Sequence, residues 1–201
     1  KVAYLPQVMV LSDGRTVREE TEQAFTHLHE AEQELKEMQR QLDERTDYET
    51  ESYMQLVERF AHESERFQMI GGLNYQSELE RTLQGLGFRR EDFDRPTSEF
   101  SGGWRMRIEL AKLLLQRPDV LLLDEPTRGI DVGAKYEIYC IIEELARSGK
   151  SIIMISSEMA ELIGMSDRIM VMCDGRVTGF IDGKDATQEN IMELATQFET
   201  V

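Results

Sequence analysis

The residues best suited to chemistry form two short groups, Ser101-Gly102-Gly103 and Asp124-Glu125. The first group opens a segment whose apolar residues have helical spacing and which ends before Pro118. Glycines let an anion approach the backbone N–H groups at the positive end of a helix, and the Ser101 hydroxyl would cap the helix or donate a hydrogen bond. The first group therefore predicts an anion-binding site.

The second group follows residues 120–123, an apolar run without polar alternation, which predicts a strand covered on both faces of a parallel sheet. Ligands of open α/β sheets bind at the carboxyl ends of the strands. Asp124 is then placed to hold a hydrated Mg²⁺, and Glu125 to polarise an attacking water. A strand that merely ends in solvated acids is the alternative. The nearby Ser101 group and Gly129-Ile130-Asp131 favour the chemical interpretation.

The composition of the 201 residues excludes several classes of protein. A formal net charge of −16 offers no basic surface for neutralising phosphates, so direct DNA binding is not expected. Neither a secretory signal nor an apolar run of about 18 residues is present, which predicts a cytoplasmic protein. Cys140 and Cys173 lie in apolar patterns and are predicted to be buried free thiols. The chain begins at Lys1 with strand-like residues, which suggests a truncated start.

Residues 16–70 predict a long arm made of an antiparallel helical hairpin. Two helical stretches are separated by the polar residues 46–50. Apolar residues repeat along both stretches with coiled-coil spacing, which favours packing of one helix on the other rather than ligand binding. The residues of this predicted seam are Ala24, Leu28, Ala31, Leu35, Met38, Leu42, Tyr53, Leu56, Phe60, Phe67 and Ile70.

The remaining sequence alternates strands with helices, which predicts an α/β fold built on a parallel sheet. Asp174-Gly175 predicts a hairpin turn into an antiparallel strand at 177–181. A further helix is predicted at 74–84, where Gly85 would end it. The predicted parallel strands are 2–5, 120–123, 151–155 and 168–172, and the later helices are 132–147, 158–163 and 187–198.

In chain order, Ser101-Gly102-Gly103, Asp124-Glu125 and Gly129-Ile130-Asp131 resemble the signature, Walker B motif and D-loop of ATP-binding cassette (ABC) ATPases. The resemblance implies a partial P-loop NTPase sheet with a helical subdomain that carries the arm. It also implies an ATP hydrolase that uses ATP and Mg²⁺. The expected partner is a second cassette, in a head-to-tail dimer or a twin-cassette chain.

The resemblance also assigns roles to individual residues. Gln7 matches the Q-loop glutamine, which contacts Mg²⁺ and the attacking water. Asp124 would bind Mg²⁺, and Glu125 would act as the general base. Ser101, Gly102 and Gly103 would contact the nucleotide of the opposite cassette, and Asp131 would contact nucleotide at the dimer seam.

The chain resembles two branches of this family. Up to about Thr127 the chain resembles the first cassette of ABC-F translation factors, because an arm separates YLPQ from FSGGWRMRIELAKLLLQRPDVLLLDEPT. Residues 127–199 resemble the second cassette of ribose- and galactose-type monosaccharide importers, through RGIDVGAK, ISSEM and SDRIMVMCDG. ISSEM places Ser157 at the switch position, where most cassettes carry a catalytic His. These features suggest a fragment or chimera joined at the shared LLLDEPT string.

Each branch implies its own partner: the ribosome for ABC-F factors, and permease subunits at the inner face of the cell membrane for importers. By the resemblance, residues 1–14 hold the end of the N-terminal sheet and the Q-loop. Residues 15–99 form the helical subdomain, with a coiled-coil arm at about 16–70. Residues 100–183 hold the signature, Walker B, D-loop and C-terminal part of the ATPase core, and residues 184–201 form a C-terminal helix.

The sequence contains no P-loop motif of the form G-x-x-x-x-G-K-[ST], whose backbone cradles phosphates. Gly149-Lys150-Ser151 matches only the tail of that motif and lies between a predicted helix and a predicted strand, so it predicts a turn. Three interpretations stay open: an incomplete ATPase cassette, a non-catalytic half-cassette or interaction module that offers its signature to a partner, and a subunit for ATP-driven sugar import. The isolated chain is expected to hydrolyse ATP weakly or not at all.

Overall fold

The computed structural model describes residues 1–7, 11 and 14–197. The chain divides into two compact units. The first comprises Lys1 and residues 9–118, and the second comprises residues 2–8 and 119–201. Among the described residues, no helix has both the length and the apolar character that crossing a bilayer requires.

The first unit is helical. The hairpin and the helix that follows the Ser101 group are its longest elements. Its helices are α1 (Val17–Glu22), α2 (Thr26–Glu44), α3 (Glu51–Met69), α4 (Tyr75–Gly85) and α5 (Gly102–Leu115), with 3-10 turns at Gln23–Phe25, Arg90–Asp92 and Thr97–Glu99.

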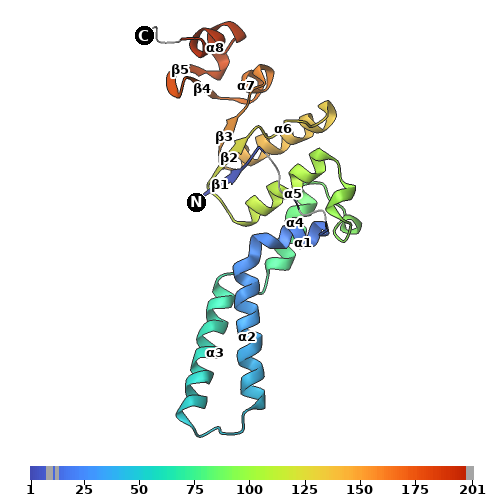
Figure 1. Cartoon of the computed structure of the whole chain (residues 1–201), viewed down its shortest axis with the longest axis vertical. Coiled ribbons are helices and arrows are strands. Elements are labelled where there is room, and N and C mark those ends of the chain that lie inside the picture. Colours follow the sequence, from blue (N-terminus) through green and yellow to red (C-terminus); the bar gives the residue numbers. More distant parts are fainter. Residues whose placement is uncertain (8–10, 12–13, 198–201) are drawn as a thin grey trace. The chain divides into compact units, whose positions relative to one another are not determined.

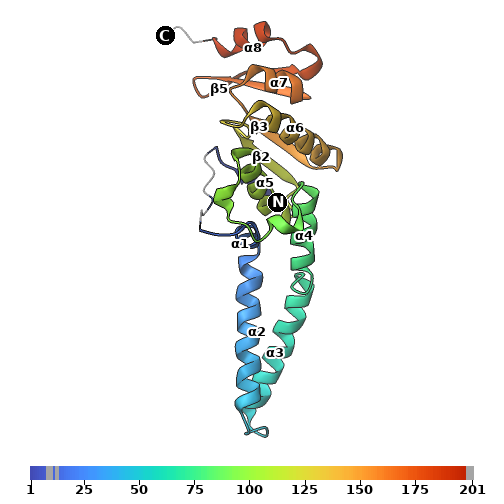
Figure 2. The ribbon, with the colours of Figure 1, turned by 90° about the vertical axis from the view of Figure 1, so that its right-hand side faces the viewer.

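Helices α2 and α3 lie side by side as an antiparallel hairpin, which confirms the predicted pair of helices (Figures 1 and 2). Leu28, Met38 and Phe67 are the buried residues of the predicted seam. Ile70 follows the last residue of α3 and is 43% exposed, so its place in the seam was predicted wrongly. The continuous helix predicted before the turn is also interrupted, by the 3-10 turn at Gln23–Phe25.

Helix α4 ends at Gly85, as predicted, but another glycine adopts the left-handed conformation that follows the helix. Gly87 has a φ of +93°, and no positive φ occurs at Gly85. A side chain at residue 87 would meet the Arg107 guanidinium, so Gly87 combines a positive φ with a close approach to α5.

The second unit contains a parallel sheet of three strands in the order β1-β2-β3. Helix α6 contacts β3 and buries Ile138 and Ile142. Cys140 lies between these residues and is exposed, so the predicted burial is wrong for that thiol. The elements are β1 (Val2–Leu5), β2 (Val120–Asp124), α6 (Val132–Arg147), β3 (Ser151–Ile155), α7 (Met159–Met165), β4 (Arg168–Cys173), β5 (Arg176–Asp182), a 3-10 turn (Gly183–Asp185) and α8 (Gln188–Ala195).

The two faces of the parallel sheet differ in burial. Leu5, Leu121 and Leu123 are almost fully buried on one face. On the other face, Tyr4 is 50% exposed and Ile153 is 54% exposed. The prediction of strands covered on both faces is therefore wrong for the described part of the chain. Continuous apolar runs do not reveal whether a second layer is present.

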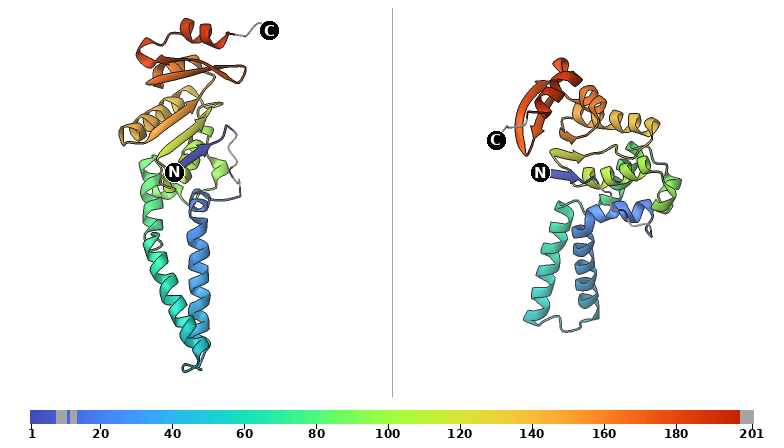
Figure 3. Two further views of the ribbon diagram at one scale, coloured as in Figure 1. Left: turned by 90° about the vertical axis from the view of Figure 1, so that its left-hand side faces the viewer. Right: turned by 45° about the horizontal axis from the view of Figure 1, so that its top comes forward.

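Strand β4 does not join the parallel sheet, contrary to the prediction. It pairs antiparallel with β5 in a separate two-stranded sheet (Figure 3). Ile169 and Val171 of β4 pack with Ile191 of α8 in a small core. The predicted turn is confirmed, because Asp174 and Gly175 both have positive φ, as type I′ hairpin turns require. The last predicted helix residue, Phe198, lies outside the described residues.

Candidate functional site

Four of the predicted site residues lie at one edge of the parallel sheet. Asp124 ends β2 and pairs with Ile155, the last residue of β3. Gln7 follows β1 by two residues, and Ser157 follows β3 by two residues. Because parallel strands end at the same edge, the fold gathers Gln7, Asp124, Glu125 and Ser157 there, which is where ligands of open α/β sheets bind.

The carboxylate of Asp124 is half-buried and has a defined partner. The Tyr4 hydroxyl donates a hydrogen bond to Asp124 Oδ2 over 3.0 Å. That hydrogen bond, together with burial and the carboxylate charge, raises the pKa of Tyr4 above its ordinary value. Tyr4 was not predicted as a site residue, because the strand register that brings it next to β2 cannot be read from the sequence.

Glu125 has an unusual backbone conformation. Its φ is +48°, which is uncommon for a residue with a side chain, and its N–H donates to the Ile155 carbonyl over 2.8 Å. Such strained residues are often found at functional sites, where the surrounding structure holds them in place. The strand pairing thus fixes the backbone from which the half-buried Glu125 carboxylate projects.

Three further candidates of this unit, Gln7, Asp131 and Ser157, are exposed. Asp131 is the N-cap of α6, where its Oδ1 accepts from the Ala134 N–H over 3.0 Å. This capping bond gives Asp131 a structural role in the chain, whatever ligand it contacts. Ser157 lies in the loop before α7, where the neighbouring Ser156 hydroxyl accepts from the Glu158 N–H over 3.0 Å.

The signature residues belong to the first unit. Helix α5 starts at Gly102, and Ser101 occupies the N-cap position with extended backbone. The Ser101 side chain makes no capping hydrogen bond, so the capping alternative is wrong, and donation of a hydrogen bond to a ligand stays a prediction. Ser101 and Gly102 are exposed and Gly103 is buried, which leaves the first turn of the helix accessible from one side.

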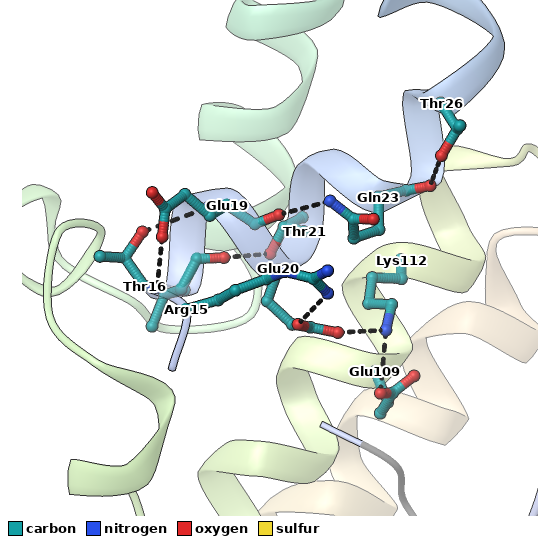
Figure 4. Close-up of polar contacts among 10 residues, drawn as sticks. Arg15, Thr16, Glu19, Glu20, Thr21, Gln23, Thr26, Glu109 and Lys112 are labelled. Carbon is teal, nitrogen blue, oxygen red and sulfur yellow. Dashed lines mark hydrogen bonds and ion pairs between the residues drawn. The ribbon is translucent and has the colours of Figure 1, made fainter. Parts of the chain in front are cut away.

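An ion cluster around the buried Glu20 carboxylate links α1 to α5 (Figure 4). Glu20 is 2% exposed and accepts from Lys112 over 2.7 Å and from Arg15 over 3.2 Å. Lys112 also donates to Glu109 over 3.0 Å. Burial alone would raise the pKa of Glu20, but the hydrogen bonds and charges of Lys112 and Arg15 outweigh it and lower that pKa.

An aromatic cluster supports the start of the same helix. Trp104 meets Phe88 edge-on, with ring centroids 4.9 Å apart, and Phe100 lies beside both. The guanidinium of Arg107 stacks 4.3 Å from the centre of the Trp104 ring and donates to the Leu86 carbonyl over 2.9 Å. Arg107 is buried although it is charged, a position that helical spacing of apolar residues does not reveal.

The donors at the sheet edge suit a hydrated Mg²⁺ that is held mainly by a nucleotide. Mg²⁺ commonly takes one or two protein carboxylates together with waters and substrate phosphates. Asp124 offers one carboxylate, and Gln7 lies at the same edge. Within the part of the chain that the structure describes, no group of three His, Cys, Asp or Glu side chains could hold a metal alone.

Known structures share this fold. The chain is similar to MJ1267, an ATP-binding cassette of an ABC transporter in its ADP conformation, with a TM-score of 0.55 and 20% identity. The match covers 62% of this chain and 51% of that one. The fold is therefore that of an α/β ATP-binding cassette. A family model described as "ABC transporter" matches residues 1–128, and the chain belongs to this family.

Two sugar-transport ATPases are similar in sequence. The galactose/methyl galactoside import ATP-binding protein MglA of Clostridium tetani is 56% identical over 121 residues. The L-arabinose transport ATP-binding protein AraG of Geobacillus stearothermophilus is 58% identical over 120 residues. Each match covers 60% of this chain, but only 24% and 23% of the relatives, so the chain spans about a quarter of their length.

The importer similarity also extends further than the sequence motifs suggested. A match of 121 residues cannot fit within residues 127–201, so it includes residues before Thr127. The importer resemblance therefore does not begin at the LLLDEPT string, where the two branches were predicted to join. These relatives favour the importer alternative over the ABC-F interpretation.

Proposed function

We propose that the chain supplies part of the ATPase cassette of a monosaccharide importer, in which ATP binding and hydrolysis drive sugar uptake. The identity of 56–58% to importer ATPases is the observation that carries this proposal. The expected location is the cytoplasmic face of the cell membrane, with permease subunits and a second cassette as partners.

The sheet edge would handle the terminal phosphate of ATP. Bound Mg²⁺ would neutralise developing phosphate charge. Asp124 and Gln7 would hold the metal and its water, while Glu125 would accept a proton from the attacking water as general base. Ser157 would donate a hydrogen bond at the switch position, although a serine lacks the charge of a protonated histidine.

The remaining roles concern the opposite cassette. Ser101, Gly102 and Gly103 would bind the nucleotide of that cassette, and Asp131 would contact nucleotide at the seam. Positioning of the phosphates requires a P-loop, and the sequence of 201 residues contains no such motif. We therefore expect the isolated chain to bind and hydrolyse ATP weakly or not at all, as a half-cassette that needs a partner.

The hairpin supports a second candidate. An arm made of α2 and α3, each of 19 residues, is the feature that resembles ABC-F translation factors, whose partner is the ribosome. Co-sedimentation of the chain with ribosomes would favour this candidate, and binding to importer permeases in membranes would favour the first.

A segment exchange tests the importer proposal. Residues 119–197 of this chain would replace the equivalent segment of the Clostridium tetani relative, and ATP-driven galactoside uptake would be measured. We expect the hybrid to transport, and Glu125→Gln within it to abolish ATP turnover while nucleotide binding persists. Arg147→Gln, on the exposed side of α6, is the matched control and should transport normally. Full turnover in the Glu125→Gln hybrid would contradict the assignment.

A further inference from the structure

Two side-chain contacts join the segment after β2 to the segment after β3. Thr127 Oγ1 donates to Glu161 Oε1 over 2.7 Å. Both residues are buried, at 1% and 3% exposure. Thr127 lies two residues after Glu125, and Glu161 lies in the first turn of α7, four residues after Ser157. This hydrogen bond therefore connects the surroundings of two predicted site residues.

The second contact connects the same segments on their more exposed side. Lys135 Nζ forms an ion pair with Glu158 Oε1. Lys135 lies one helical turn after Asp131, and Glu158 directly follows Ser157. The ion pair raises the pKa of Lys135, chiefly through its hydrogen bond to Glu158. The Lys135 side chain is 16% exposed and that of Glu158 is 47% exposed, so solvent screens part of this interaction.

The buried carboxylate is poorly explained by stability alone. Within the part of the chain that the structure describes, the buried Glu161 Oε2 has no hydrogen-bond partner, and an unpaired buried oxygen is unfavourable. Tyr139 of α6 lies beside Thr127 and Glu161, and burial together with the Glu161 charge raises its pKa above the ordinary value. An apolar residue at position 161 would avoid the unpaired oxygen but would lose the bond to Thr127. Positioning of Thr127 is thus a reason for a carboxylate at this place.

We propose that the Thr127–Glu161 and Lys135–Glu158 contacts form a latch that holds the D-loop segment 127–131 and the switch segment 156–158 as one body. Glu161 and Lys135 are then positioning residues, which act on a nucleotide only through Asp131 and Ser157. This inference rests on the proposed function for its purpose, but the mechanical coupling exists without nucleotide. Release of one contact should therefore loosen both segments.

Amide hydrogen exchange of the nucleotide-free chain tests the coupling. The reporters are the N–H groups of Arg128 and Ile130 on one side, and of Glu161 and Leu162 on the other, because all four make backbone hydrogen bonds. E158Q changes the switch segment, whereas Arg128 and Ile130 lie in the D-loop segment. If the two segments are coupled, E158Q should speed exchange of the Arg128 and Ile130 amides roughly two- to five-fold. K135E should speed exchange of the Glu161 and Leu162 amides by a similar factor.

Rescue and a control separate coupling from general loosening. The double variant K135E/E158K should restore near-native exchange on both sides, because the ion pair is rebuilt with reversed charges. T127V should speed exchange at Glu161 and Leu162 about ten-fold, whereas T127S, which keeps the hydroxyl, should not. E143Q breaks an exposed ion pair on α6 and should leave all four amides unchanged.

The proposal is overturned if each substitution affects only its own segment, or if the charge-reversed pair fails to restore exchange. Amide exchange of both segments is measured without ATP, so these results do not depend on the importer proposal. Failure of the segment exchange with intact coupling would reject the function and keep the latch. The opposite result would reject the latch and keep the function.

Discussion

At the scale of single residues, an ion pair links two helices of the first unit. Glu20 and Lys112 form a nearly buried ion pair between α1 and α5, in which Lys112 makes the shorter of the two hydrogen bonds to the Glu20 carboxylate. Breaking a buried pair from one side leaves an uncompensated charge, which is far more unfavourable than losing a surface pair.

Lys112→Met should therefore destabilise the chain by about 3 kcal/mol, because Glu20 keeps only Arg15. Urea unfolding followed by circular dichroism measures this free energy. Arg40→Gln, which removes two exposed helix pairs on α2, is the control and should change stability by less than about 1 kcal/mol. Equal effects of the two substitutions would show that the Glu20 pair is solvated in solution.

The lowered pKa of Glu20 predicts how the stability of the chain depends on pH. The pKa of Glu20 is lowered in the folded chain, so its carboxylate contributes stability above the ordinary pKa of 4.5. That contribution is lost as pH falls from this value through the lowered folded-state pKa. Unfolding free energies measured as a function of pH should fall less steeply in Glu20→Gln than in the native chain across this acid range. Parallel pH curves would contradict the assignment.

At the scale of elements, the corner between β5 and α8 depends on a close backbone approach. A Cβ added at Gly183 would lie 1.9 Å from the Ser166 carbonyl oxygen, and the Gly183 N–H donates to the Asp167 carbonyl over 2.7 Å. Because the obstacle is backbone, it cannot move aside as a flexible side chain would.

Gly183→Ala should destabilise the chain by about 1–3 kcal/mol, the usual range for overpacking. Gly164→Ala in α7 is the matched control, because nothing lies within 4 Å of its Cβ position. That control should be neutral or should stabilise by up to about 1 kcal/mol, since alanine favours helix. Thermal unfolding of both variants distinguishes these outcomes, and a neutral Gly183→Ala would show that the corner relaxes.

The elements also show what the sequence could and could not predict. Helix α6 and strand β3 have the predicted bounds, because clear periodicity and turn residues define them. The hairpin of β4 with β5 was predicted, but β4 was wrongly placed in the parallel sheet. The alternating burial of Ile169 and Val171 reflects packing against α8 instead, and that contact cannot be read from the strand sequence. At the site, motif order placed Asp124 and Glu125 at the sheet edge. Tyr4 and Glu161 were missed because tertiary contacts define their roles.

At the scale of the whole chain, net charge and exposed apolar surface have opposite effects on self-association. A net charge of −16 keeps molecules apart by repulsion. One face of the parallel sheet, however, exposes the apolar residues Val2, Tyr4, Ile153 and Ile155. Exposed apolar surface of this kind favours association. Salt weakens the repulsion, because the screening length falls to about 10 Å at 0.1 M and about 3 Å at 1 M.

The chain should therefore self-associate increasingly as salt rises from about 0.05 to 0.5 M, because only the repulsive term is screened. Sedimentation velocity measures the change. Ile153→Thr should reduce the association, since it places a hydroxyl on the exposed sheet face while keeping a β-branched strand residue. Met54→Gln removes a similarly exposed apolar side chain from α3 and should leave the association unchanged. If Met54→Gln reduced association as much as Ile153→Thr, the contact would lie on the arm instead of the sheet.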